Sequence, residues 1–366
     1  MKKTLLFLAI IPCIAFAIES SSKDYYNSID SKLDKENPNP IYYPATDKML
    51  GLVGVEFLYW KAIQGSSDWA IQGQIGTQNG SNEAVGQIGK FHIAKFDWDP
   101  GFRVYTGLQF NPHFWELIGE YTYYHSSRNS ILYPVNQELA LNEPNMLPYA
   151  LIGTYPQFTD SATSVAKIKT HLNYNGANLY IGKRLFFSSI FLKFYMGLTG
   201  GWLNEEWRFV YIGTSMNPNK QKWKFHGGGM RIGLNTDWAL GYGFTLLGKF
   251  SIAELLGYYR QKSFSFSTNT GPDGNGIGNI VQNVTYSDNR IATNLQFFMG
   301  ISYSRKLCKS LITSIYIGYE INSWLNLHET IQSVSSSTRS FDGRSTLLKR
   351  GTLSLHGLTT GMSFYF

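Results

Sequence analysis

The chain ends with the stretch Leu355-His356-Gly357-Leu358-Thr359-Thr360-Gly361-Met362-Ser363-Phe364-Tyr365-Phe366, whose side chains alternate in character. A β-strand places successive side chains on opposite faces. One face of this stretch therefore carries Leu358, Thr360, Met362 and Phe364, and the other carries Gly357, Thr359, Gly361, Ser363 and Tyr365. One wall is apolar and tolerates lipid, while the other is small and polar. This pattern is typical of the closing strand of a membrane barrel, although an edge strand of a soluble sandwich shares it.

The same residues resemble the terminal strand of bacterial outer-membrane proteins, whose closing aromatic residue is read by the insertion machinery. The resemblance implies that Phe366, Phe364 and Met362 form a barrel-insertion signal. It also implies the barrel-assembly machinery as a partner.

The opposite end of the chain carries an export signal. Lys2 and Lys3 precede an apolar run that closes on Ala15-Phe16-Ala17, which predicts a cleaved signal peptide at 1–17. Pro12 disfavours a lipid anchor on Cys13. Cleavage leaves Cys308 as the one cysteine, so an intramolecular disulfide is excluded, whereas an inert thiol and an intermolecular disulfide both stay open.

Composition excludes several classes of protein. No later run of 18 apolar residues could cross a membrane as a helix. The chain holds 36 Gly, 24 Tyr and 24 Phe with 16% charged residues, as expected of a barrel that hides its apolar side chains by alternation. The formal charge of +7 comes without a clustered Lys/Arg patch, so we expect no nucleic-acid partner, and no pattern indicates a cofactor.

Segments with a period of two are separated by gaps of alternating length. We predict ten strands, at 51–62, 88–110, 114–126, 167–184, 189–212, 222–238, 243–258, 288–305, 310–326 and 351–366. Mostly long gaps lie at 63–87, 127–166, 213–221, 259–287 and 327–350, and short ones at 111–113, 185–188, 239–242 and 306–309. This parity predicts an all-β, up-and-down antiparallel transmembrane barrel with short periplasmic turns and long extracellular loops.

Two boundaries stay open at this stage. Residues 18–50 are polar and rich in proline, and are interpreted as a periplasmic segment with a short helix near Asp30 to Asp34, or as a disordered tail, before a barrel at 51–366. Within 88–110, Asp99-Pro100-Gly101 is interpreted as a bulge. A hairpin there would favour the second choice of twelve strands.

The faces of the predicted strands differ in polarity. Apolar walls include Leu192, Phe194, Met196 and Leu198; Phe244, Leu246, Phe250 and Ile252; Leu295, Phe297, Met299 and Ile301; and Ile315, Ile317, Tyr319 and Ile321. The opposite walls predict the lumen-lining residues Glu56, Arg103, Glu116, Glu120, Arg184, Lys193, Arg231, Lys249 and Glu320. Aromatic residues near the long loops, at Tyr121, Tyr123, Trp202, Tyr258 and Trp324, predict an interfacial belt, with a second belt near the turns.

Several motifs in order resemble one known family. They are Glu56-Phe57-Leu58-Tyr59-Trp60-Lys61-Ala62, Asp97-Trp98-Asp99-Pro100-Gly101-Phe102-Arg103, Trp115-Glu116-Leu117, Tyr121-Thr122-Tyr123-Tyr124-His125, Gly227 to Gly229 with Arg231-Ile232-Gly233-Leu234-Asn235, and Leu355 to Phe366. The set is similar to the pore-forming outer-membrane protein family first seen in Legionella and abundant in environmental chlamydiae. The resemblance implies a porin-like role in the cell outer membrane and supplies no catalytic residues.

We therefore expect passive diffusion of small hydrophilic solutes or ions through a narrow polar lumen. Ten strands make a narrow barrel, and its four inward acids and five inward bases either pair and plug it or line a small pore. The alternative is a surface barrel whose loops 127–166 and 259–287 mediate adhesion or host contact. Outer-membrane lipid is an expected partner, and homo-oligomerisation stays open.

Enzymatic activity is not expected. The histidines His125, His171, His226 and His328 lie near the loop rim, but no spacing ties them to a Ser or Asp partner. No histidine pair has metal-ligand spacing, so no metal site is predicted.

Overall fold

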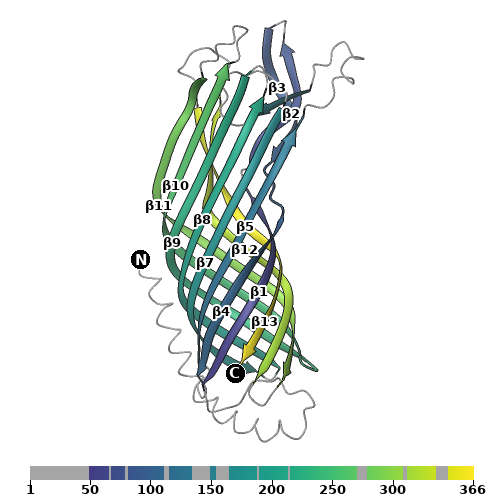
Figure 1. The fold of residues 1–366 in the computed structure, drawn as a ribbon, viewed down its shortest axis with the longest axis vertical. Coiled ribbons are helices and arrows are strands. Elements are labelled where there is room, and N and C mark those ends of the chain that lie inside the picture. Colours follow the sequence, from purple (N-terminus) through teal and green to yellow (C-terminus); the bar gives the residue numbers. More distant parts are fainter. Residues whose placement is uncertain are drawn as a thin grey trace, which may run out of the picture.

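The computed structural model describes residues 49–65, 67–78, 81–110, 115–133, 149–153, 165–187, 189–212, 215–269, 278–307, 311–334 and 345–366. These residues fold almost entirely as β-strands (Figure 1). Across the described ranges, no helix has the length and apolar character needed to span a membrane. The predicted signal peptide, most of the segment 18–50 and Cys308 lie outside the described residues.

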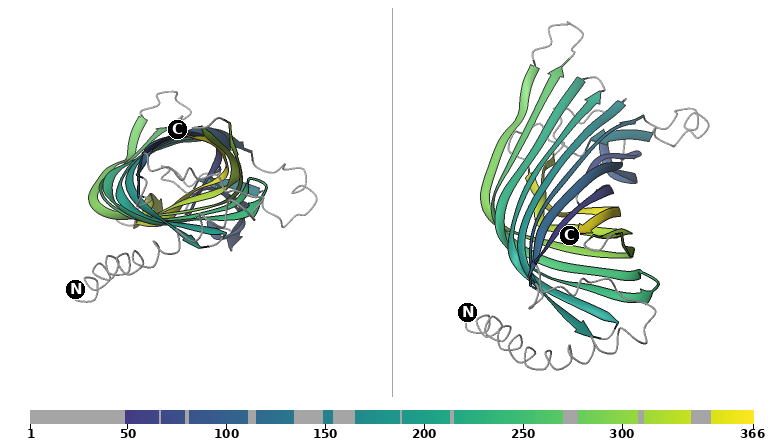
Figure 2. Two further views of the ribbon diagram at one scale, coloured as in Figure 1. Left: turned by 90° about the horizontal axis from the view of Figure 1, so that it is seen from below. Right: turned by 60° about the horizontal axis from the view of Figure 1, so that its bottom comes forward.

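Ten strands close into one antiparallel barrel, which confirms the predicted fold and strand number. In order around the wall they are β1 (Leu50–Gln64), β13 (Ser345–Tyr365), β12 (Ile312–Val334), β11 (Gly278–Lys306), β10 (Phe244–Asn269), β9 (Ser215–Gly241), β8 (Ile190–Ile212), β7 (Val165–Phe187), β5 (Trp115–Leu132) and β4 (Trp98–Phe110). β1 pairs with both β13 and β4 and so closes the ring, seen along its axis in Figure 2.

A small second sheet corrects the segment predicted at 88–110. Its strands are β2 (Asp68–Gln78), β3 (Ser81–Ile93) and β6 (Tyr149–Gly153). Residues 88–93 thus belong to β3, and the barrel strand begins at Trp98. Asp99, Pro100 and Gly101 pair in register with Trp60, Tyr59 and Leu58, so they form neither the predicted bulge nor a hairpin. Pro100 has no backbone N–H to donate toward the neighbouring segment Leu58 to Trp60. This is tolerated because Pro100 lies near a strand end.

The strands are longer than a membrane requires. A hydrocarbon layer needs about 9–11 residues per tilted strand, whereas β9 has 27 residues and β11 has 29. The end of the barrel with the short turns, the start of β1 and the C-terminus is here called the turn end, and the opposite end the loop end. Much of the sequence predicted as loops at 213–221 and 259–287 is therefore strand that extends the wall at the loop end, and much of 327–350 is strand as well.

The side-chain pattern inverts along β8. From Leu192 to Trp202 the outward positions are apolar, but further on they are Asn204, Glu206 and Arg208. The inward positions change in the opposite sense, from Lys193 and Thr199 to a buried run of Leu203, Trp207, Phe209 and Tyr211. A barrel in lipid must be apolar outside, and one in water must be polar outside. The inversion therefore marks the upper limit of the apolar band near Trp202.

The top of the β12–β13 hairpin leaves the barrel wall. Pairing of β12 with β11 ends at Leu325 opposite Thr293, and Asn326 has a positive φ of 58°. Beyond it, Leu327, His328, Glu329 and Thr330 are all buried. β12 and β13 pair again from His328 opposite Gly351 to Val334 opposite Ser345. This segment is called the inner hairpin, and it replaces part of the loop predicted at 327–350.

The prediction that Trp324 belongs to the interfacial aromatic belt is wrong. Trp324 is 2% exposed and packs edge-on against Tyr174 and Phe225, inside the barrel. Tyr121, Trp202 and Tyr258 do lie on the outer face. The alternation that places Trp324 inward is the same one that places Glu320 inward, four residues earlier on the same strand.

Glycines let β9 approach β10 closely, and this gives a first testable prediction. A Cβ built on Gly229 would overlap the backbone carbonyl of Glu254, whereas one on Gly228 meets nothing nearer than 3.6 Å. We expect Gly229→Ala to lower the free energy of unfolding by about 1–3 kcal/mol through overpacking. Gly228→Ala is the matched control and should change it by less than about 0.5 kcal/mol. Urea unfolding in detergent micelles measures both, and equal effects would contradict the prediction.

Candidate functional site

The barrel interior is the candidate site. All nine residues predicted to line the lumen project inward, from eight different strands. Eight of them are no more than 16% exposed, and Lys249 is the most open at 35%. They form two groups of ion pairs at different heights in the barrel.

The group nearer the turn end is centred on Glu116. Its carboxylate contacts Arg184 Nε at 2.5 Å and Lys193 Nζ at 3.0 Å, and the three side chains come from the adjacent strands β5, β7 and β8. Glu116 is 2% exposed, so its charge depends on these two cations. The group carries one surplus positive charge.

The second group is centred on Arg103, which is 3% exposed. Its guanidinium contacts Glu56 at 2.5 Å, Glu320 at 2.7 Å and Glu120 at 3.7 Å. It also donates to Thr122 Oγ1 at 3.0 Å and lies 5.5 Å from the centre of the Trp60 ring. Three carboxylates from β1, β12 and β5 thus converge on one arginine, whose planar fork can bond several oxygens at once. This set is called the Arg103 cluster.

Further cations and hydroxyls complete the Arg103 cluster. Lys249 Nζ lies 3.6 Å from Glu56, which also accepts a hydrogen bond from the Tyr316 hydroxyl. Glu320 accepts from Thr359 at 3.0 Å and from Gln296 Nε2 at 2.6 Å. The buried carboxylates therefore have most of their lone pairs satisfied, as buried ionic networks require.

Arg231 is held by amides and a hydroxyl. It donates to Ser251 at 3.1 Å, to Gln296 at 2.5 Å and to Asn294 at 2.8 Å. Gln296 in turn bonds Glu320, so the positive charge of Arg231 reaches the acids of the Arg103 cluster through one amide. The Arg103 cluster with Arg231 then carries three acids and three bases.

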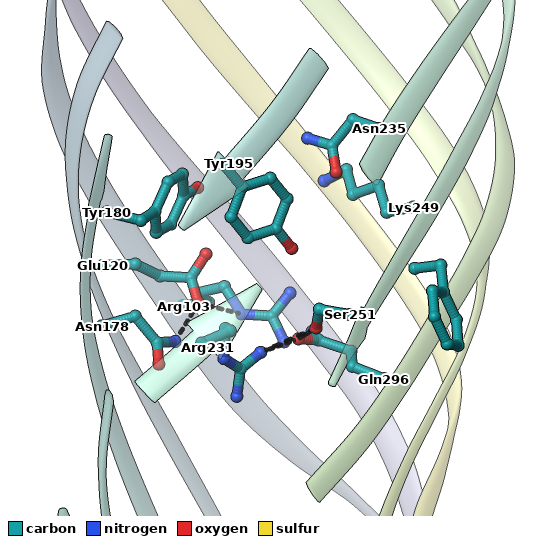
Figure 3. Close-up of a pocket in the computed structure, with 11 residues that line it drawn as sticks. Arg103, Glu120, Asn178, Tyr180, Tyr195, Arg231, Asn235, Lys249, Ser251 and Gln296 are labelled. Atoms are coloured by element: carbon teal, nitrogen blue, oxygen red, sulfur yellow. Dashed lines mark hydrogen bonds and ion pairs between the residues drawn. The ribbon is translucent and has the colours of Figure 1, made fainter. Parts of the chain in front are cut away.

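A small cavity lies beside these groups. It has a volume of about 40 Å³, and Figure 3 shows its lining of Arg103, Glu120, Asn178, Tyr180, Tyr195, Arg231, Asn235, Lys249, Ser251 and Gln296. Because one water needs about 10–15 Å³ of such volume, the cavity holds on the order of three waters. This cavity is too small for a hydrated solute.

An apolar layer closes the barrel nearer the loop end. Side chains from most strands form one buried cluster, which includes Leu58, Trp60, Tyr124, Leu172, Tyr174, Leu203, Trp207, Phe209, Tyr211, Trp223, Phe225, Leu255, Tyr259, Trp324, Leu327, Leu353 and Leu355. Trp69, which starts the second sheet, joins it, and its carbonyl accepts a hydrogen bond from Tyr211 at 2.6 Å. Water and ions are excluded from a layer packed in this way.

The inner hairpin lies within this apolar layer. The His328 ring is 5.4 Å from the Trp207 ring and 5.2 Å from the Trp223 ring, although β12 is not a neighbour of β8 or β9 in the wall. The backbone carbonyl of Glu329 accepts a hydrogen bond from Trp223. The inner hairpin therefore crosses the lumen and contacts the opposite wall.

One ion pair clamps the inner hairpin to the wall. Arg290 of β11 contacts Glu329 at 3.0 Å and Asp288 at 2.8 Å, and its guanidinium stacks 3.6 Å from the centre of the Tyr259 ring. Burial opposes the charge on Arg290, but the hydrogen bonds that its guanidinium donates to Glu329 and Asp288 outweigh burial and raise the Arg290 pKa. Burial, and next the Glu329 carboxylate, raise the pKa of Tyr259. In the clamp, the charged guanidinium of Arg290 therefore stacks on the neutral phenol ring of Tyr259.

The histidines do not form a site with shared chemistry. His125 and His171 lie on the outer face with ring centres 6.4 Å apart, and His226 packs beside Tyr258. His328 lies 3.4 Å from Glu205, and both are about 2% exposed. Within the part of the chain that the structure describes, no group of three or more His, Cys, Asp or Glu residues could hold a metal ion.

The sequence interpretation missed the apolar layer and the clamp. The signal for the apolar layer is the inversion after Trp202, where Trp207, Phe209 and Tyr211 alternate with Glu206 and Arg208. The signal for the clamp is weak, because Arg290 and Glu329 are 39 residues apart. Arg290 lies at the end of a predicted strand, and Glu329 lies in a predicted loop. Their pairing depends on the inner hairpin folding into the lumen, which alternation alone does not predict.

Comparisons with known proteins point to one family. The family model described as Legionella pneumophila major outer membrane protein precursor matches residues 42–366. No curated protein matches the chain.

Several solved outer-membrane structures are similar in part. The outer membrane protease OmpT from Escherichia coli has a TM-score of 0.42 at 11% identity, over 88% of this chain and 97% of that chain. A FadL homologue from Pseudomonas aeruginosa has a TM-score of 0.23 at 9% identity, over 91% and 93%. The toluene transporter TodX from P. putida has a TM-score of 0.22 at 5% identity, over 89% and 92%.

Proposed function

The chain belongs to the Legionella major outer membrane protein family, and from this premise we propose that it is a gated channel for small solutes or ions. Membership places it in the outer membrane as a β-barrel. The polar interior at membrane height supports the channel, and the inner hairpin supports a gate that is closed in the present conformation.

The inner hairpin is the observation that carries this proposal. A hairpin that leaves the wall at a single residue with positive φ, Asn326, and returns to the wall at Gly351 has a defined hinge. Among the described residues, its contacts on the lumen side include the clamp, the hydrogen bond from Trp223, the contact of His328 with Glu205 and aromatic packing, whereas its base is continuous with the wall. Such an element can move as a unit while the barrel stays intact.

The Arg103 cluster then acts as a narrow filter. Its three acids lie within 3.7 Å of Arg103, and Lys249 supplies a second cation within 3.6 Å of Glu56. Ions can pass such a layer when side chains exchange partners, since no backbone has to move. Among the nine lumen-lining residues, five bases face four acids, and this one-charge basic excess favours anions weakly.

A surface barrel without conductance is the second candidate. The apolar layer favours it, because a continuous buried cluster of aromatic residues resembles the core of a soluble domain and stabilises the extracellular end. In that case the loops would carry the function.

Single-channel recording tests the proposal. We expect the refolded mature chain to be closed most of the time in a planar bilayer. A variant in which a short Asn-Gly turn replaces residues 327–350 should conduct in discrete steps, with a reversal potential shifted toward that of the anion in a salt gradient. A silent hairpin-shortened variant, with insertion verified by heat-shift electrophoresis, would refute the channel and leave the surface barrel.

A further inference from the structure

The outer face of the loop end carries a concentrated set of cations. They project outward from four neighbouring strands, β7 to β10, and include Lys169, Arg208, Lys220, Lys222, Lys224 and Arg260. Lys167 and Lys262 extend the set at its edges. We call this surface the basic wall. The sequence showed no clustered patch because these residues are two apart within each strand and spread over nearly a hundred positions.

Strand register brings these cations side by side. Arg208 pairs directly with Lys169 on one side and with Lys220 on the other, while Lys222 pairs with Lys262 and Lys224 with Arg260. Neighbouring strands lie about 4.8 Å apart. Like charges opposite each other in a sheet are destabilising, so the bare surface is unfavourable and an anion bound to it would relieve the repulsion.

The acid among them neutralises a small part of the charge. Glu206 contacts Arg208 at 2.5 Å, Lys220 at 3.3 Å and Lys222 at 3.5 Å, and it is the one acidic side chain that the described residues place within the basic wall. Burial, followed by Lys169, lowers the pKa of the adjacent His171, consistent with a positive local potential. Arg208 and Lys220 remain 58% and 46% exposed and are open to a ligand.

The position of the basic wall indicates its ligand. On β8 and β9 it begins two to six residues beyond Trp202 and His226, which follow directly on the apolar band of Leu198 and Met230. Six residues of a strand tilted by about 40° rise about 15 Å. The cations therefore stand at the height of the lipid headgroups of the outer leaflet.

The basic wall ends at the strands that flank it, β5 and β11. On the flanking strands the outward positions at this height are neutral, at Ser127 and Asn129 of β5 and at Thr285, Ser287 and Asn289 of β11. A surface that needed charge only for solubility would have it all around. A one-sided patch adjoining the membrane fits one lipid or a few.

We propose that the basic wall binds the phosphate groups of lipopolysaccharide in the outer leaflet of the membrane that surrounds the barrel. Arg208 and Arg260 offer bidentate donors for phosphate oxygens, and the lysines of β9 add point charges between them. The acyl chains of the same lipid pack on the apolar band below. This inference rests on the outer-membrane location and is independent of whether the barrel conducts.

Binding of lipid A to the refolded mature chain in detergent micelles tests it. The probe is bisphosphorylated lipid A, compared with lipid A from which both phosphates have been removed. The test variant is K220Q/K222Q/K224Q/R260Q. The matched control K90Q/K95Q/R305Q/K306Q removes four exposed cations elsewhere and has the same net charge.

We expect the wild-type chain to prefer the phosphorylated lipid, and the test variant with its four replaced cations to lose roughly 600-fold in affinity at low salt, from roughly fivefold for each cation near a charged surface. The control should stay within about twofold. Inorganic phosphate at millimolar concentration should not displace the lipid, because it lacks the acyl chains.

Three results would overturn the proposal: equal binding of the dephosphorylated lipid, an equal loss in the control, or equal competition by free phosphate or by a soluble polyanion such as heparin. If heat-shift electrophoresis shows that the quadruple variant is unfolded, K222Q/K224Q replaces it, with K90Q/K95Q as its control and an expected loss of about 25-fold from the same fivefold for each cation.

Discussion

Replacing Arg103 by Ala is expected to lower the free energy of unfolding of the barrel by about 3–5 kcal/mol, because breaking a buried ion pair leaves uncompensated charge. Arg103 is 3% exposed and faces Glu56 and Glu320, which are 2% and 1% exposed. Without the guanidinium, three carboxylates converge on one side of the lumen with Lys249 as the remaining cation near Glu56. Neither water nor another side chain can fill the place of a planar, five-donor group.

The control for this variant is an exposed ion pair between β5 and the residue that precedes β4, the strand that carries Arg103. Arg128 contacts Asp97, and their side chains are 34% and 54% exposed. Arg128→Ala should change stability by no more than about 1 kcal/mol, as is usual for exposed ion pairs. Arg103→Lys keeps the charge but loses the fork, so its effect should fall between the two. Urea unfolding followed by tryptophan fluorescence measures all three, and an Arg103→Ala effect no larger than that of Arg128→Ala would contradict the structural role of the cluster.

Alternation predicted the barrel and the faces of its strands. Phe194, Met196 and Leu198 are outward, and Lys193 and Thr199 are inward. A wall that faces lipid must be apolar, so only this assignment of the two faces is possible. The short gaps between strands then determine which neighbours pair. The same reasoning placed Arg103, Glu56 and Glu320 on the inner face, but their mutual distances depend on strand stagger, which the sequence pattern does not contain.

The loop end was predicted less well, for a physical reason. There the outer solvent changes from lipid to water, so polar outward residues such as Lys220 and Lys222 suggest a loop although they belong to a strand. Segment 88–110 was misjudged because β3 and β4 both alternate and are separated by four residues, Ala94 to Asp97, of which Ala94 and Phe96 are buried like strand residues. The inner hairpin depends on contacts with the opposite wall, which are too distant in sequence to predict.

The two closed layers differ in what is needed to open them. At membrane height, Arg103 has three carboxylates to choose among and a hydrated cavity beside it, so exchange of partners involves side chains alone. Nearer the loop end, an ion meets Trp207, Trp223 and Tyr259, which offer few polar partners and exclude water. In the proposed channel, conduction therefore depends on the inner hairpin, and the clamp between Arg290 and Glu329 helps to hold this hairpin in place.

Replacing Arg290 by Gln is expected to raise the open probability of the channel roughly 30-fold or more, because removing one partner of a buried charge pair costs about 2–5 kcal/mol and 1.4 kcal/mol is a factor of ten. Glu329, which is 0% exposed, would be left buried without its guanidinium partner. Outward movement of the inner hairpin would expose the Glu329 carboxylate to water and so remove this cost. Glu329→Gln should act in the same direction, since Arg290 keeps Asp288 but loses its hold on the hairpin.

Two further variants make this prediction specific. The double variant R290Q/E329Q places two amides in contact and removes both charges, so it should be closed more often than either single variant. Glu254→Gln is the control, because Glu254 lies on the outer face of β10 and bonds Thr293 at 2.9 Å without contacting the inner hairpin. Single-channel open probability in planar bilayers is the readout for all four. If R290Q opens no more often than E254Q, the clamp does not hold the gate. If the double variant opens as often as the single ones, the buried charge is not what drives the hairpin outward.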